Sequence, residues 1–184
     1  MKRSFLFLAA IVLSGVAYAD SRIWPPSPYS IMSNQGVTVM RFTPKIKGSD
    51  VVATRVQSFT FDEKTSRYAL ALDRELTGFW EPTFAFAAKN PNVLVFLFCR
   101  PDMALAVVDT SSGKIVMSKT FQELVPEYLD YRDRSTSTLQ WCRQPFTSEG
   151  KLYLPGGILN GEDAKRGPSF IVDLTTYQVT REKE

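Results

Sequence analysis

Residues 93–98 read Val-Leu-Val-Phe-Leu-Phe, and this run decides the fold because none of its positions is polar. A strand with one solvated face alternates apolar and polar residues, whereas a strand covered on both faces is apolar throughout. Turn residues bound the run, with Lys89-Asn90-Pro91-Asn92 before it and Arg100-Pro101-Asp102 after it. We therefore expect a central strand over Val93–Cys99 that is buried on both faces.

Similar short apolar or alternating runs, each bounded by turn residues, extend on both sides of this strand. The other expected strands are Val37–Phe42, Val51–Phe61, Arg67–Leu72, Thr83–Ala88, Met103–Val108, Lys114–Lys119, Thr136–Cys142, Lys151–Leu154, Ser169–Asp173 and Tyr177–Arg181. A turn holding Pro44 and Gly48 separates the first two, and Gly113 suits the left-handed conformation of a hairpin loop. The pattern predicts a mainly β fold: an antiparallel meander sandwich or a partial propeller-like domain with one short helix.

Three of the predicted hairpins resemble one another, at residues 61–68, 108–115 and 172–179. In each, an aspartate ends an apolar strand, where its side chain can accept hydrogen bonds from turn amides. The three aspartates are 47 and 64 residues apart, which resembles the spacing of propeller blades. Three units are too few for a typical closed ring of roughly 4 to 8 blades, so a sandwich of meanders or a partial propeller fits the length better.

One helix is predicted, beginning at Thr120, because Thr120 and Glu123 have the spacing of a capping box. Pro126 then limits its length, since proline lacks the amide that a helix interior requires. We expect one or two turns through Tyr131. Further along, the glycine-rich segment Pro155–Pro168 is expected to be a loop.

The N-terminus has the order of a secretory signal peptide: Lys2 and Arg3, an apolar run over residues 5–16, then the small-residue site Ala17-Tyr18-Ala19. We expect cleavage after Ala19 and a periplasmic or secreted protein. The apolar run is shorter than the ~20 residues that span a membrane, and no other stretch is comparable. No transmembrane segment is therefore expected in the mature chain.

Three segments follow: a signal peptide over 1–19, a proline-rich extended arm over 20–36 and a single β-rich domain over 37–184. The arm has three prolines within residues 23–29, so this stretch cannot form a central strand or a helix. The chain is 44% apolar, which is far from the composition of a disordered protein. The signal contains two of the 22 basic residues and none of the 19 acidic ones, which leaves a balance of +1, and nucleic-acid binding is not expected.

Two cysteines, Cys99 and Cys142, remain in the mature chain. In an oxidising compartment the leading interpretation is a disulfide between them, closing a loop of 43 residues. Such a bond contributes about 3 to 4 kcal/mol in the chain-entropy picture. Two buried free thiols and a metal pair are the alternatives, and the metal pair is the weakest because no histidine is present to complete a zinc site.

The chain contains no histidine, which excludes Ser-His-Asp and Cys-His catalysis and histidine-based metal sites. Ser111 and Lys114 have the spacing of a Ser-x-x-Lys motif, but they fall in a predicted hairpin turn rather than on a helix. Paired carboxylates could serve glycosidase chemistry, although every domain of this size offers similar sets. The candidates are Glu81, Asp130, Asp133, Glu162 and Asp163. We expect no enzyme activity, no cofactor and no metal ion.

Aromatic side chains are the remaining candidates for contact with another molecule, because Tyr and Trp are enriched where proteins bind one another. Tyr128 and Tyr131 lie in a run that alternates acidic, aromatic and basic residues, and they are the aromatics most expected to be exposed. Ordinary packing is the alternative for each of them.

The middle of the chain carries Gly78-Phe79-Trp80, Phe86, Val93-Leu94, Leu105–Asp109, Ser111 and Lys114-Ile115-Val116. This set, spread over about 40 residues, resembles the small periplasmic immunity proteins that protect bacteria from peptidoglycan-cutting type VI secretion amidases. The resemblance implies a small, β-rich, disulfide-bearing exported protein that plugs a toxin's active-site cleft with a loop between strands. By position that loop comprises Arg100, Pro101, Asp102 and Met103.

Three classes of function remain open. The leading hypothesis is an exported non-catalytic binding protein, an immunity or inhibitor protein that blocks a secreted cell-wall-active enzyme by inserting a loop into its cleft. The second is an accessory or structural subunit of a bacterial envelope complex. The third is a carboxylate-dependent enzyme or a binder of small ligands. The first two predict a protein partner, either a secreted toxin or an envelope protein.

Overall fold

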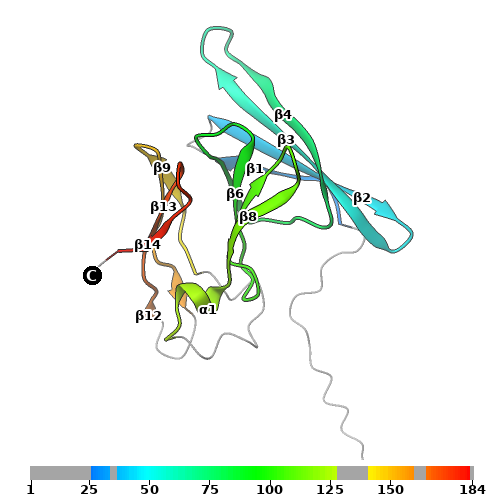
Figure 1. Cartoon of the computed structure of the whole chain (residues 1–184). Coiled ribbons are helices and arrows are strands. Elements are labelled where there is room, and N and C mark those ends of the chain that lie inside the picture. Colours follow the sequence, from blue (N-terminus) through cyan, green and yellow to red (C-terminus); the bar gives the residue numbers. More distant parts are fainter. Residues whose placement is uncertain (1–25, 34–36, 128–140, 160–164, 183–184) are drawn as a thin grey trace, which may run out of the picture.

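The computed structural model describes residues 26–33, 37–127, 141–159 and 165–182. This part of the chain is mainly β, with three four-stranded antiparallel sheets, one two-stranded ribbon and one short helix (Figure 1). Within the four-stranded sheets, each strand pairs with its neighbour in the chain, so every sheet is a meander apart from one insertion in the third. The mainly β fold predicted from sequence is confirmed.

The first sheet contains the longest strands. Its members, in both spatial and chain order, are β1 (Tyr29–Ser33), β2 (Thr38–Lys47), β3 (Asp50–Asp62) and β4 (Arg67–Thr77). The pairing register shifts between Ser58 and Phe59 of β3, where β4 carries the extra residue Ala71. Figure 1 shows that the β3–β4 hairpin extends beyond the body formed by the other two sheets.

The second sheet lies in the middle of the molecule (Figure 1). Its members are β5 (Phe84–Ala87), β6 (Val93–Leu97), β7 (Leu105–Asp109) and β8 (Lys114–Lys119). All five residues of β6 are buried. Val93, Val95 and Leu97 belong to the core shared with the third sheet, whereas Leu94 and Phe96 belong to the core shared with the first sheet. The expectation of a strand covered on both faces is confirmed.

The third sheet follows the helix in the chain. Its members, in spatial order, are β14 (Val179–Arg181), β13 (Phe170–Asp173), β10 (Lys151–Leu154) and β9 (Phe146–Ser148). The ribbon of β11 (Ile158–Leu159) and β12 (Lys165–Arg166) is inserted between β10 and β13. This ribbon lies in the glycine-rich segment expected to be a loop.

The helix α1 (Phe121–Leu124) is a single turn with the expected capping box. The amide of Glu123 donates to the Thr120 hydroxyl at 3.2 Å, and the amide of Thr120 donates to the Glu123 carboxylate at 2.7 Å. Phe121 and Leu124 are buried in the core between the second and third sheets. The expected continuation to Tyr131 lies outside the described residues.

The three similar hairpins are the connections between the third and fourth strands of the three sheets. In each, the aspartate accepts the amide of the residue two positions later: Lys64 on Asp62 at 3.0 Å, Ser111 on Asp109 at 2.8 Å and Thr175 on Asp173 at 2.8 Å. The predicted role of the aspartates is confirmed. The turn thus recurs at the same position in each sheet, and the second sheet packs between the other two.

The first sheet has two features that the sequence did not predict. Part of the expected arm, Tyr29–Ser33, forms β1, because the prolines end at Pro28 and the next residues keep the amides that pairing requires. Pro44, expected in a turn, lies within β2. Its missing amide is tolerated because β1 pairs with β2 only as far as Phe42, which leaves β2 with no described partner on that side at Pro44.

Two more differences concern the segment before the third sheet. The expected strand Thr136–Cys142 is described only at Trp141 and Cys142, where Cys142 makes a single isolated bridge to Gly156. The short strand β9 was not expected, because Phe146–Ser148 offers only one large apolar residue. It forms because β10 provides a neighbouring edge.

Candidate binding surface

Among the described residues, packing covers only one face of the first sheet. Met40, Phe42 and Val56 on its inner face are fully buried against the second sheet. Side chains alternate across a strand, so the residues between these positions lie on the opposite face, called here the outer face. No described element packs against the outer face as a sheet does against the inner one.

An apolar row crosses all four strands on the outer face. The pairing register aligns Met32 of β1 with Val39 of β2, Val39 with Phe59 of β3, and Phe59 with Leu70 of β4. Val39 and Phe59 are half-buried, whereas Met32 is 67% exposed and Leu70 is 55% exposed. Cross-strand pairs of this kind stabilise a sheet but leave the row in contact with water.

A second row lies next to the first, toward the tip of the β3–β4 hairpin. Phe61 pairs with Tyr68, and the Phe61 amide donates to the Val37 carbonyl at 2.8 Å. The rings of Phe61 and Tyr68 are in edge contact, with centroids 5.3 Å apart, and all three side chains are more than a third exposed. The two rows form the outer patch, defined as Met32, Val37, Val39, Phe59, Phe61, Tyr68 and Leu70.

The other half of the outer face is charged. Arg55 donates from Nε to Oδ1 of Asp73 at 2.8 Å, and Gln57 donates to Oδ2 of Asp73 at 3.1 Å. The hydrogen bond with Arg55 lowers the pKa of Asp73 and raises the pKa of Arg55. Lys45 forms an ion pair with Glu75. The two acidic side chains of β4 are therefore already paired within the sheet.

The loop expected to contact a partner lies close to the body of the protein. The amide of Phe98 donates to the Ala104 carbonyl at 2.9 Å, and the amide of Phe121 donates to the Pro101 carbonyl at 3.0 Å. Met103 packs against the core shared with the first sheet, and only Asp102 is exposed. Arg100 and Pro101 are half-buried. Tyr128 and Tyr131, the other expected contact residues, lie outside the described residues.

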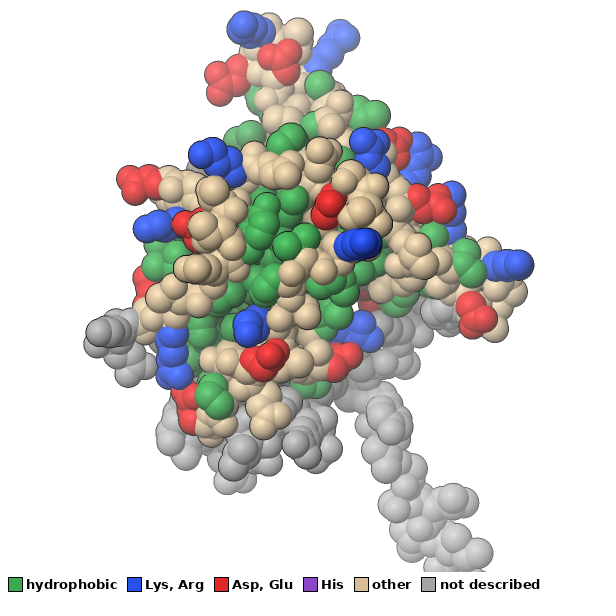
Figure 2. All heavy atoms as spheres, in the orientation of Figure 1, with side chains coloured by type: hydrophobic (Ala, Val, Ile, Leu, Met, Phe, Trp, Pro, Cys, Tyr) green, Lys and Arg blue, Asp and Glu red, His purple; other side chains and the backbone are tan. Residues whose placement is uncertain are grey.

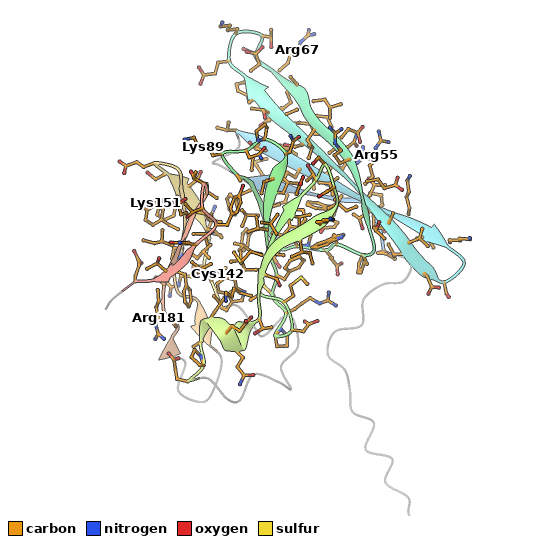
Figure 3. The ribbon with its side chains drawn as sticks, viewed as in Figure 1. Arg55, Arg67, Lys89, Cys142, Lys151 and Arg181 are labelled. Atoms are coloured by element: carbon orange, nitrogen blue, oxygen red, sulfur yellow. The ribbon has the colours of Figure 1, made fainter. Side chains whose placement is uncertain are left out.

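The two cysteines lie close together as free thiols, where the sequence predicted a disulfide. The indole of Trp141 donates to the Phe98 carbonyl at 2.7 Å. Cys142 follows Trp141 in the chain and Cys99 follows Phe98, so this bond holds the two cysteines near each other. Burial raises the pKa of the Cys142 thiol, and the electrostatic influence of Cys99 raises it further. Figure 3 places Cys142 among the side chains between the second and third sheets. The disulfide prediction rested on the compartment, which is a property of the environment and not of the fold.

The catalytic and metal-binding sites considered from the sequence have little support in the described residues. The Ser111 hydroxyl donates to Asp109 at 2.6 Å as part of a turn, as the hairpin reading of this motif predicts. Glu81 is half-buried, and the other four candidate carboxylates lie outside the described residues. The described residues contain no group of three acidic or cysteine side chains arranged for a metal ion, and no helix in them is long and apolar enough to span a membrane.

One pocket of about 620 Å³ opens between the second and third sheets. Its walls are the end of β5 with Lys89, the β9–β10 turn with Glu149, and the β13–β14 turn with Asp173. Asp173 is engaged by its own turn, because the amides of Thr175 and Thr176 both donate to it, and these bonds lower its pKa. Among the described residues, the pocket is lined by one basic side chain, Lys89, and two acidic ones, Glu149 and Asp173.

The outer patch was not predicted from the sequence, although the spacing of its residues in the sequence indicates it. Phe59 and Phe61, and likewise Tyr68 and Leu70, are two residues apart and so share one face of a strand. Sequence alone does not tell which face of a strand is covered, so it does not show that these residues are exposed. Comparison of the sequence with protein-family models and with curated proteins finds no match, and the function must be argued from the geometry.

Proposed function

We propose that this protein is an exported, non-catalytic binding protein that holds a protein partner through the outer patch. The observation that carries the proposal is the pair of exposed apolar rows on the outer face of the first sheet, which no described element covers. Contiguous apolar surface of this kind marks interaction sites, and its aromatic members are residue types enriched where binding energy concentrates.

The projecting hairpin gives this surface a shape suited to entering a cleft. The β3–β4 hairpin extends beyond the body (Figure 1), and Figure 2 shows charged side chains gathered at its tip. Among these, Glu63, Lys64 and Arg67 are exposed. A charged tip keeps the hairpin soluble when no partner is bound, and the apolar rows behind it supply the contact area.

The partner in this proposal is a secreted enzyme that cuts the cell wall, and binding inhibits it. Support comes from the resemblance to immunity proteins in the middle of the chain and from the signal-like N-terminus. The β3–β4 hairpin replaces the loop Arg100–Met103 as the inserted element, because that loop is held against α1 and the hairpin projects.

The proposal includes a disulfide between Cys99 and Cys142 after export. The two thiols exchange with a small-molecule disulfide oxidant, so that one protein disulfide forms and two oxidant thiols are released. Their proximity supports this step. The bond would fix the loop Arg100–Met103 to the segment that enters the third sheet.

The direct test mixes the purified protein with peptidoglycan amidases delivered by type VI secretion. We expect a one-to-one complex by size-exclusion chromatography and loss of peptidoglycan cleavage with one of them. Tyr68→Ala should weaken the complex at least about tenfold, a typical cost for an aromatic contact. Ile115→Ala is the matched control, because Ile115 and Tyr68 are both 46% exposed.

Two results would overturn the proposal. One is that no amidase is bound or inhibited by the unaltered protein. The other is that Tyr68→Ala and Ile115→Ala weaken the complex equally, since the outer patch would then have no special part in binding. A stable large assembly in the envelope fraction, without any inhibited enzyme, would favour a structural subunit instead.

A further inference from the structure

The pocket between the second and third sheets has the size and the rigid walls of a small-ligand site. Its volume of about 620 Å³ lies within the range of roughly 300 to 1,000 Å³ that is usual for such sites. The amide of Lys89 donates to the Leu174 carbonyl at 3.2 Å, and the amide of Leu174 donates to the Gly150 carbonyl at 3.0 Å. These two bonds fix the end of β5 and the two turns of the third sheet around the pocket.

The pocket has a basic wall and an acidic wall. The second sheet supplies Lys89, just after β5, whereas the third sheet supplies Glu149 from the β9–β10 turn and Asp173 from the β13–β14 turn. Lys89 and Glu149 are both exposed. Neither forms an ion pair with another residue that the structure describes, and in particular they do not pair with each other.

The two carboxylates of the acidic wall differ in what already engages them. The amides of Thr175 and Thr176 donate to Asp173, and these bonds, together with the charge of Lys151, lower its pKa. No hydrogen bond from a described residue reaches the Glu149 carboxylate. Glu149 is therefore the acidic group that the fold leaves for a ligand.

The backbone at Glu149 gives a second reason to assign it a role outside the turn. Ser148 pairs with Lys151, so the loop between them has only two residues, and both have positive φ: 50° at Glu149 and 73° at Gly150. Hairpin turns of this kind favour asparagine, aspartate or glycine at the first position. The turn does not require a glutamate, whose longer side chain lines the pocket.

The arrangement of charge selects the class of ligand. A simple anion attracted to Lys89 would be repelled by the acidic wall, and a simple cation attracted to Glu149 would be repelled by Lys89. A molecule with a carboxylate at one end and an ammonium at the other matches both walls. The remaining lining includes Ala87, Ala88 and Leu174, which offer apolar surface to methyl-sized groups.

We infer that this pocket binds a short peptide with small side chains and two free termini, its α-carboxylate on Lys89 and its α-ammonium on Glu149. The pocket lies between the second and third sheets, whereas the outer patch lies on the first sheet. The inference therefore goes beyond the proposed function and does not depend on it.

The probes are dialanine and trialanine, titrated into the whole protein and followed by NMR. We expect at least one of them to bind in the millimolar range and to shift the amide signals of residues 87–89 and 147–150. The same peptide with an acetylated N-terminus, or with an amidated C-terminus, should bind at least about threefold more weakly, because each cap removes one charge pair.

Lys89→Gln should weaken binding of the uncapped peptide by a similar factor. Lys47→Gln is the matched control and should leave it unchanged, because Lys47 is also an exposed lysine but lies at the end of β2 in the first sheet. Glu149→Asn separates a ligand role from a structural one. Asparagine suits the left-handed conformation, so this variant should resist urea at least as well as the unaltered protein while binding the peptide at least about threefold more weakly.

Three results would overturn the inference. The first is that neither peptide binds at about 10 mM. The second is that the capped peptides bind as tightly as the uncapped one, since the termini would then not be recognised. The third is that Lys89→Gln or Glu149→Asn keeps the original affinity, which would leave that side chain without a part in binding.

Discussion

At the scale of single residues, one glycine is required by close packing and not by its backbone angles. A Cβ at Gly156 would lie 1.8 Å from the carbonyl oxygen and 2.7 Å from the carbonyl carbon of Gly167. Both atoms belong to the backbone, so no side-chain movement can relieve the overlap. The Gly156 amide also donates to the Ser169 hydroxyl at 3.1 Å, which ties the start of the ribbon to β13.

Gly156→Ala should therefore lower the free energy of unfolding by about 3 kcal/mol or more, at the upper end of overpacking costs. Urea denaturation of the variant and the unaltered protein measures this difference in the free energy of unfolding. Gly150→Ala is the control, because a Cβ there meets nothing within 4 Å and only the positive φ of 73° opposes it. That strain costs about 1 to 2 kcal/mol. Equal losses in the two variants would contradict the packing argument.

The raised pKa of the Cys142 thiol predicts a pH dependence that also reports its redox state. In the unfolded chain a cysteine ionises near pH 8.5, whereas the folded protein keeps this thiol neutral to higher pH. In reducing buffer the free energy of unfolding should therefore fall as pH rises above about 8.5, by at most about 1.4 kcal/mol per pH unit. Protein oxidised at these two cysteines should lack this fall.

Denaturant titrations at pH 7 to 10, with and without reductant, measure the effect. Cys142→Ser in reducing buffer is the control and should show a smaller fall. If the exported protein gives the same profile with and without reductant, and both thiols react with a thiol reagent after unfolding, the disulfide is absent.

At the scale of elements, each of the three aspartate turns joins the third strand of its sheet to the fourth. Hydrogen bonds from the Ser111 side chain, from the Ser111 amide and from Ser112 lower the pKa of Asp109. A lowered pKa in the folded state means that the bonds stabilise the protein above the unfolded pKa of about 3.9 and are lost as pH falls through the folded pKa.

Asp109→Ala should therefore be less stable than the unaltered protein at pH 7, and the difference should be smaller at pH 2. Urea midpoints at the two pH values measure this. Asp102→Ala should be neutral at both, because Asp102 is exposed and no hydrogen bond of its side chain is described. A difference that persists undiminished at pH 2 would show that the charge of Asp109 is not what stabilises the turn.

Elements with a strong local signal could be predicted from the sequence. The all-apolar run of β6, the capping box of α1 and the three aspartate turns each depend on residues within a few positions of one another. β1, β9 and the position of Pro44 could not be predicted, because each depends on where a distant strand begins or ends its pairing. The outer patch is of the same kind, since exposure depends on which sheets stack.

At the scale of the whole molecule, the second sheet belongs to two cores at once. Phe96 is fully buried toward the first sheet, where its ring contacts Phe42 at 5.7 Å and Trp80 at 5.5 Å between centroids. On the opposite face, Val95 and Leu97 pack toward the third sheet. Unfolding of either outer sheet therefore exposes one face of the middle one.

Phe96→Ala should lower the free energy of unfolding by about 3 to 5 kcal/mol, the usual cost of a large cavity in a core. The loss should appear in a single cooperative transition, because the middle sheet links both cores. Leu70→Ala, on the exposed outer patch, should change stability by less than about 0.5 kcal/mol. Two separate transitions in calorimetry would show instead that the first sheet unfolds independently.

The central claim is that the outer patch binds a protein partner, and the most direct measurement is the partner's affinity for two variants of matched exposure. Leu70 is 55% exposed on the outer patch and Val116 is 51% exposed on β8. Calorimetric titration of an inhibited amidase into each variant should show at least about a hundredfold loss for Leu70→Asp, because a charge would be buried at the contact. Val116→Asp should leave the affinity within about twofold of the original. Unchanged affinity for Leu70→Asp, or an equal loss for both variants, would contradict the claim.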